Sequence, residues 1–368
     1  MSEIFRTLVT IVLFFGILGL LVIGHELGHF VAARLFRVRV LEFGIGFPPR
    51  AKVMRDVGET VYTLNWLPIG GFVKLEGEDG DEADDPRSFA SQGLIRQLLI
   101  LLAGVAMNLL LAGVIFSAIT FAADPAGGIY VPIVDPGSPA AVAGLQSGDV
   151  LVRVDGTAVS YFEGRSILDE IRARAGETVD LTVTRSNQTV DLTATLRTAD
   201  EVAAGKGALG IRGTVSDPFR RILTKDRVSH SAADALSLGV SRTVAATGLI
   251  VDGVGQLLTS IVTHPTEPPP ASGPVGIATQ IGDVFWTLGP VVTLYLAGIL
   301  SANLAVVNIL PFPPLDGGRM LMLVLKRVLG SRLSLRAERL TYVLGFVLLL
   351  VFLVWITGFD IARQLGGG

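Results

Sequence analysis

The sequence predicts a polytopic α-helical membrane protein of about four transmembrane helices, with a membrane-associated β-hairpin and an inserted extracytoplasmic α+β domain. Half of the 368 residues are hydrophobic and the mean hydropathy is +0.58, which is too apolar for an ordinary soluble protein. Several apolar runs are long enough to cross a bilayer, which takes about 20 residues. Between the second and third runs, short β-rich stretches alternate with Gly, Pro and Asp turns.

The predicted transmembrane helices are 1–33, 98–122, 290–318 and 340–358. Buried core helices are the alternative, but the last of these segments contains no charged side chain. The first is unlike a cleaved signal peptide, because it is long and no small-residue cleavage site precedes the histidines at its end. We therefore expect all four segments to span the membrane.

Two clusters of basic residues predict the orientation. One lies in the loop 34–97 and the other in a loop at 319–339. Cytoplasmic loops are enriched in Lys and Arg, so both loops are expected in the cytoplasm. An even number of spans then places both termini and the segment 123–289 on the outer side of the cell inner (plasma) membrane.

The cytoplasmic loop contains a predicted β-hairpin at about 60–77. Two β-rich stretches flank Pro68-Ile69-Gly70-Gly71, a typical turn sequence. A hairpin so close to a span either stays in the loop or enters the membrane, where protein or a water-filled cavity must cover its polar backbone.

The outer segment combines a small folded domain with a helical part. Residues 127–213 include β-rich runs and a helical stretch, Gly164–Arg174, and they resemble a PDZ domain, most clearly in GSPAAVAGLQSGDVLVRVDG. A generic β-barrel-like module is the alternative. Residues 214–289 contain apolar side chains at helical spacing and then a proline-rich loop. This pattern favours an amphipathic helix on the outer membrane surface, with a fifth span as the alternative.

Composition excludes several kinds of partner and site. The net charge is −3 and no basic stripe is dense, so a nucleic-acid partner is excluded and membrane lipid is expected instead. The chain has no cysteine, so disulfides are excluded. Any metal site must then use His, Asp or Glu.

The sequence HELGH, which begins at His25, ends the first apolar run. In a helix, His25 and His29 lie on one face, about 6 Å apart along the axis, and both can reach one metal ion. Glu26 lies about 100° around the helix, where it can contact a water at the metal without being a ligand. This is the arrangement of two zinc ligands and a general base. Three ionisable groups in one turn at membrane depth are costly unless they are functional.

Zinc needs a third protein ligand, and Asp316 in NILPFPPLDGGR is the best candidate. It follows the third span on the same inner side as the histidines, whereas His230 and His264 belong to the outer segment. Prolines end the preceding helix, and two glycines after Asp316 allow a tight turn. The alternative is that Asp316 only caps the next helix.

Together these motifs resemble the site-2 protease family of intramembrane zinc metalloproteases, in particular its bacterial RseP-like branch with an outer PDZ insert. The matching sequences are HELGH, GFPPR, PIGGFVKLEGE, SGPVGIA and NLAVVNILPFPPLDGG, in this order and over nearly the whole chain. The chain departs from the family at Val105, where relatives usually have proline, and it shows one PDZ-like domain where many have two. Pro132 in the expected first PDZ strand removes a backbone donor.

The resemblance implies that His25, His29 and Asp316 bind Zn²⁺ and that Glu26 is the catalytic base. It also implies that the hairpin, with Gly70 and Gly71, receives the substrate as an added strand. By the same resemblance, Asn308 positions the substrate or its oxyanion, with Asn108 and Asn303 as weaker candidates. Hydrogen bonding between helices is the alternative role for all three asparagines.

The function predicted in this way is hydrolysis of peptide bonds in or near the transmembrane segments of single-pass membrane proteins. The family setting implies regulated intramembrane proteolysis after a first extracytoplasmic cut, with anti-sigma factors or signal-peptide remnants as possible substrates. Two other interpretations remain: a catalytically silent scaffold that presents a PDZ domain, and a metal-handling transporter. Neither needs Glu26 next to two metal ligands.

Overall fold

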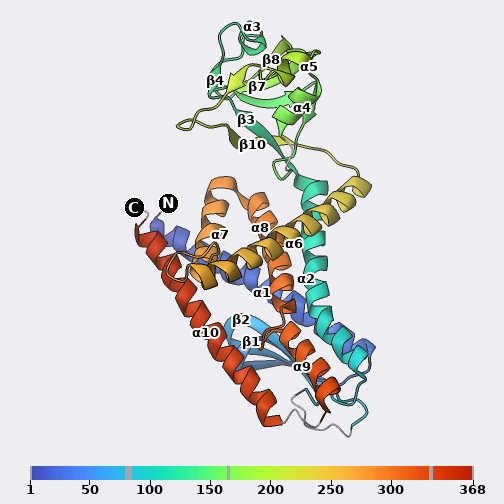
Figure 1. Ribbon diagram of the computed structural model, residues 1–368. Helices are drawn as coiled ribbons and strands as arrows, with labels where there is room; N and C mark the ends of the chain where they lie inside the picture. Colours follow the sequence, from blue (N-terminus) through green and yellow to red (C-terminus); the bar gives the residue numbers. More distant parts are fainter. Residues whose placement is uncertain (1, 79–84, 164–165, 331–334, 367–368) are drawn as a thin grey trace. The chain divides into compact units, whose positions relative to one another are not determined.

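The computed structural model describes residues 2–78, 85–163, 166–330 and 335–366 (Figure 1). They divide into two compact units, one made of residues 1–117 and 236–368 and the other of residues 118–235. The second unit is larger than the predicted domain 127–213 and extends beyond it at both ends.

Five helices in the described part of the chain are long and apolar enough to cross a membrane. They are α1 (Glu3–Leu35), α2 (Leu94–Ala123), α6 (Ala232–Thr263), α8 (Pro290–Ile309) and α10 (Leu335–Gly366). Four of them correspond to the predicted spans, but α8 is shorter than the predicted span 290–318, which continues past Ile309 through a non-helical turn into the next helix. The fifth, α6, is the helix that the sequence favoured for the membrane surface; it is the least apolar of the five but meets the same criterion. The protein is thus a polytopic helical membrane protein with β-sheets.

The first unit is built around α1, which begins after Ser2, whose hydroxyl accepts a hydrogen bond from the Phe5 amide. α1 crosses α2 closely at Gly28, where a Cβ would lie only 2.3 Å from the Ala103 carbonyl oxygen. Small residues at such crossings allow two backbones to approach. Ala33, Ile100 and Leu101 are buried beside this crossing, in one apolar core with residues of the β-sheet.

The predicted hairpin exists, but its position and turn differ from the prediction. It consists of β1 (Val40–Val57) and β2 (Thr60–Leu75), joined at Gly58, which has a φ of +68°. Glycine adopts this left-handed conformation without strain, which fixes the turn there. Pro68–Gly71 therefore lies inside β2 and is not the hairpin turn.

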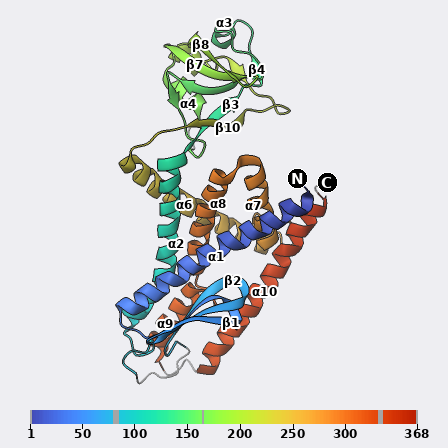
Figure 2. The same ribbon diagram turned by 180° about the vertical axis from the view of Figure 1, so that it is seen from behind.

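Both strands are long and fold back on themselves. Residues 42–45 of β1 pair with 61–64 and also with 71–74 of β2. Residues 50–57 pair with 60–65. Residues 71–74 thus pair with a strand segment on one side only, residues 42–45, and form one edge of the sheet. Both views place the sheet next to the second half of α1 (Figures 1 and 2).

In the first unit, two further helices of the described chain were not predicted. The basic segment 319–339 was expected to be a loop, but more than half of it belongs to α9 (Asp316–Leu329). Apolar residues recur between the charged residues of this helix, and Met322 is buried. Residues 331–334 of that segment lie outside the described residues. The last part of the segment 214–289 forms α7 (Pro274–Leu288), which begins with Pro274 in the first turn, where proline needs no hydrogen-bond partner.

The second unit is a small α+β domain around an antiparallel sheet with strand order β10-β3-β5-β7-β8. Its elements are β3 (Pro125–Tyr130), β4 (Ile133–Val134), α3 (Pro139–Val142), β5 (Val150–Val154), β6 (Thr157–Ala158), α4 (Ile167–Ala173), β7 (Thr178–Arg185), β8 (Gln188–Thr195), α5 (Ala199–Ala203), β9 (Ile211–Arg212) and β10 (Arg220–Arg227).

The core of this unit contains Leu151, Val154, Leu181 and Val183, which are fully buried in neighbouring central strands. β10 completes the sheet from outside the predicted domain, since it pairs with β3. Pro132 lies between β3 and β4, so no strand loses a donor to it. Residues 164–165 of the predicted helical stretch lie outside the described residues, and the stretch continues as α4.

Candidate metal centre and active site

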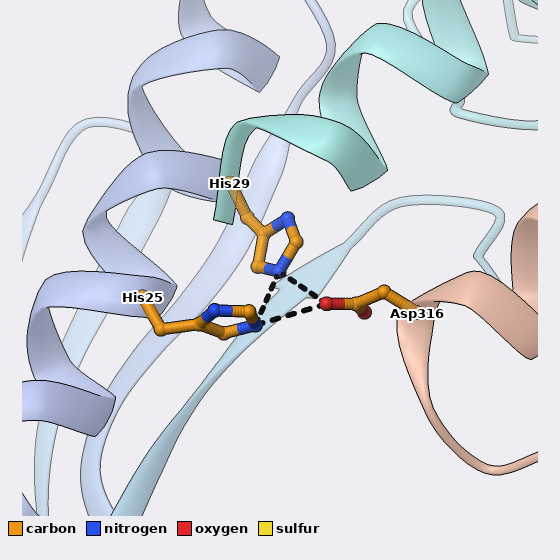
Figure 3. A group of neighbouring side chains, drawn as sticks. All are labelled: His25, His29 and Asp316. Carbon is orange, nitrogen blue, oxygen red and sulfur yellow. Dashed lines mark hydrogen bonds and ion pairs between the residues drawn. The ribbon is translucent and has the colours of Figure 1, made fainter. Parts of the chain in front are cut away.

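His25 and His29 lie one turn apart near the end of α1 and are almost completely buried, with exposed fractions of 5% and 7%. An apolar helix can carry two imidazoles on one face only if both have partners, because unpaired polar groups are costly in a nonpolar environment. Both rings face the start of α9 (Figure 3).

Asp316 is brought to the histidines by the turn between α8 and α9. α8 ends at Ile309, before the three prolines of the segment 310–315. The first turn of α9 packs tightly against this segment: a Cβ on Gly317 would lie 2.1 Å from the Ile309 carbonyl oxygen, and one on Gly318 would lie 2.5 Å from the Phe312 carbonyl carbon. The two glycines of LDGG therefore let Asp316 reach α1.

Three side-chain atoms converge on one point (Figure 3). His25 Nε2 and Asp316 Oδ2 are 2.9 Å apart, His29 Nε2 and Asp316 Oδ2 are 3.3 Å apart, and the two Nε2 atoms are 3.1 Å apart. Ligand atoms at about 2.0–2.1 Å from a tetrahedral zinc ion are about 3.3 Å from one another. Two nitrogens and one oxygen at these separations fit a zinc site with one open position.

The electrostatic state of Asp316 suits a ligand. Burial disfavours its carboxylate, but hydrogen bonds and charge from His25 and His29 outweigh burial and hold its pKa below the ordinary range. The ionised carboxylate is the form that binds a metal ion.

Glu26 lies on the same turn as His25 but outside the cluster of three ligand atoms. Its side chain faces the edge of the β-sheet, since a Cβ built on Gly71 would lie 3.6 Å from Glu26 Cγ. Gly70 and Gly71 are both buried, and Gly70 has a φ of +80°. The Glu26 side chain thus lies beside the backbone of Gly71, one residue after the ligand His25.

The second nitrogen of each histidine is held by α2. His29 Nδ1 donates to the Ile100 carbonyl at 2.9 Å, and His25 Nδ1 lies 3.3 Å from the Asn108 amide. A histidine that binds metal through Nε2 carries its proton on Nδ1. Asn108 Oδ1 is buried and has no partner among the described residues, so the amide orientation that turns Oδ1 towards His25 satisfies both groups.

This geometry gives Asn108 a different role from the predicted one. Its side chain is fully buried and faces Nδ1, on the opposite edge of the His25 ring from the ligand atom. Orientation of His25 is therefore favoured over contact with a substrate oxyanion. Asn308 Nδ2 lies 3.4 Å from His25 Nε2, at the ligand cluster, whereas Asn303 lines an apolar cavity of about 220 Å³ between α1, α7 and α8.

Gly104 is a functional residue that the sequence analysis missed. A Cβ at this position on α2 would lie 2.4 Å from His29 Nε2 and 2.8 Å from His25 Cε1. The only signal in the sequence is a glycine in an apolar helix, which commonly marks helix packing. His230 and His264 are not part of the cluster of metal-ligating residues found in the described chain.

Replacement of Asn108 by Ala should weaken zinc binding. We expect a loss of affinity of about 10- to 100-fold, as is typical when the hydrogen-bond partner of a metal-binding histidine is removed. Competition with a fluorescent chelator would measure it. Ser301→Ala is the matched control, because it removes a 2.8 Å bond to the Asn108 carbonyl oxygen and leaves His25 untouched. Equal affinity in wild type and Asn108→Ala would exclude the orienting role.

Comparison with known proteins places these observations in a family. The sequence profile of Peptidase family M50 matches residues 13–352. A protein of Clostridium perfringens named "putative zinc metalloprotease" is 31% identical over 93% of this chain and 95% of its own length. A protein of the same name from Clostridium acetobutylicum is 31% identical over 97% and 98%. Zinc metalloprotease RasP of Geobacillus kaustophilus is 27% identical over 97% and 99%.

Proposed function

Since one family profile covers most of its length, the chain belongs to peptidase family M50, the site-2 protease family, and we propose that it cleaves single-pass membrane proteins in or near their transmembrane segments. It is a zinc metalloprotease. The observation that carries the proposal is the position of the site. Both histidines and Glu26 belong to a helix that is long and apolar enough to cross a membrane, which supports a reaction on peptide bonds at membrane depth.

In the proposed hydrolysis of a peptide bond, five residues bind zinc, transfer the proton or stabilise the developing negative charge. Zinc held by His25 Nε2, His29 Nε2 and Asp316 Oδ2 would supply a Lewis acid that makes water nucleophilic near neutral pH. Glu26 takes a proton from the attacking water and returns it to the leaving amine. Asn308, 3.4 Å from His25 Nε2, donates to the oxygen on which negative charge develops.

The edge at residues 71–74 is proposed to bind the substrate. Its register pairs it with residues 42–45, and a substrate in extended conformation can add on its other side. Addition as a strand converts a helical peptide bond into an accessible one. The lack of a side chain at Gly71 supports this role, because a Cβ there would lie 3.0 Å from the Gly44 carbonyl oxygen and 3.6 Å from Glu26 Cγ, so glycine lets this backbone approach Glu26 closely.

The second unit is proposed to be a PDZ-like domain that controls access from the extracytoplasmic side. A substrate whose outer domain has been removed by a first cut would then be admitted, as in regulated intramembrane proteolysis of anti-sigma factors or signal-peptide remnants. A cavity lined by Glu3 of α1 and Gln364 of α10 supports the same-side placement of both termini. The ends of these helices lie close together in both views (Figures 1 and 2).

Removal of zinc should abolish cleavage of a trimmed single-pass membrane substrate in detergent. We expect chelation to stop cleavage and stoichiometric Zn²⁺ to restore it, because the ion provides the Lewis acid. Mass spectrometry of the products should place the cut in or near the transmembrane segment. Cleavage that survives complete removal of zinc, or that occurs only in soluble segments, would contradict the proposal.

A further inference from the structure

A charged pair connects the edge of the β-sheet to the helix that carries Asp316. Arg319, three residues after Asp316 in α9, pairs through Nη2 with Glu78 Oε1. The other carboxylate oxygen of Glu78 accepts a hydrogen bond from the Leu75 amide at 3.0 Å. Glu78 thus contacts the last residue of β2 and α9 at the same time.

The pair is too enclosed to be an ordinary surface contact. The side chain of Arg319 is 27% exposed and that of Glu78 is 16% exposed. Burial disfavours the guanidinium charge, but the Glu78 carboxylate more than compensates and raises the pKa of Arg319. Removing one partner of such a pair leaves an uncompensated charge and costs more than the loss of an exposed pair.

The two ends of the edge contact different parts of the active site. At Gly71, the edge lies beside Glu26. At Leu75, it is held by Glu78, and through Arg319 by the first turn of α9. Asp316 in that turn contacts His25, which precedes Glu26 in the chain. The catalytic base, the edge strand and the ligand helix therefore form a closed ring of contacts.

We propose that Glu78 and Arg319 are a positioning pair that fixes the edge strand relative to Asp316, so that a substrate bound on the edge meets the metal and Glu26 in register. This inference rests on the proposed binding of substrate at residues 71–74. A strand can still bind by its backbone when the pair is broken, but its scissile bond is misplaced. Misplacement by about 1 Å can lower a catalytic rate about 100-fold.

A double-mutant cycle in the full-length protein tests this inference. Glu78→Gln and Arg319→Gln should each lower kcat about 10- to 100-fold, the usual effect of losing a supporting contact at a metal site. KM for a trimmed single-pass substrate should change less than kcat, and zinc should remain stoichiometric. The double variant should be no slower than the slower single variant, because both changes remove the same contact. Arg319→Lys should recover part of the rate.

Lys326→Gln is the matched control. Lys326 lies on a later turn of α9 than Arg319, and it forms a 3.1 Å ion pair with Glu338 of α10. This substitution should leave kcat unchanged. Additive losses in the cycle, loss of zinc in the single variants, or an equal loss in Lys326→Gln would overturn the inference. Wild-type protein that cleaves no membrane substrate would contradict the proposed function instead, so the two failures are distinguishable.

Discussion

Glu26→Gln is expected to abolish peptide cleavage while zinc stays bound. Glutamine keeps the shape of the side chain but cannot accept a proton from water at neutral pH. General-base catalysis contributes about 10²- to 10⁴-fold, so kcat should fall by at least about 100-fold, or about 3 kcal/mol. Zinc should remain because the three convergent ligand atoms belong to His25, His29 and Asp316.

The measurement compares cleavage of a trimmed single-pass substrate by wild type and Glu26→Gln at matched zinc content. Glu3→Gln is a suitable control, because it makes the same change at the exposed start of the same helix. Equal cleavage would show that Glu26 is not the base. Loss of zinc from Glu26→Gln would instead make Glu26 a ligand, and cleavage by neither protein would favour the silent scaffold.

Local chemistry explains why part of the site could be predicted from the sequence. His25, Glu26 and His29 occupy one helical turn, and a helix of known period fixes their relative positions. Asp316 follows His29 by 287 residues in the sequence. Only the need for a third ligand and the resemblance to a family predicted that the two side chains meet. The structure brings all three ligand candidates within contact of one another.

Tertiary contacts explain what the sequence did not predict. Pro68–Gly71 has stronger turn residues than Gly58-Glu59, but pairing of residues 50–57 with 60–65 fixed the turn at Gly58. β10 is rich in charge and is a strand because it pairs with β3. The pair Glu78–Arg319 has no local signature, since its partners are far apart in the chain and meet only through the sheet and α9.

Gly104→Ala is expected to remove both zinc and activity, although it adds only one methyl group. Its Cβ would lie 2.4 Å from His29 Nε2 and 2.6 Å from His29 Cε1, closer than nonbonded carbon and nitrogen atoms approach. His29 cannot rotate away without losing its hydrogen bond to Ile100. α2 is itself held in place by the close crossing at Gly28, so the methyl group displaces a ligand.

Metal analysis and cleavage of a trimmed substrate would measure this effect. Gly113→Ala is the matched control on α2, because its Cβ would meet Thr243 Oγ1 at 3.5 Å, an ordinary contact. In a helix, Ala is about 0.5–1 kcal/mol more favourable than Gly, so neither variant should lose α2 itself. Full zinc content and activity in Gly104→Ala would contradict this expectation, because α2 would then have moved away from the histidines to make room for the methyl group. Loss in Gly104→Ala alone would show that a glycine on the second helix is as necessary to the metal site as its ligands, because it provides the space in which two imidazoles meet.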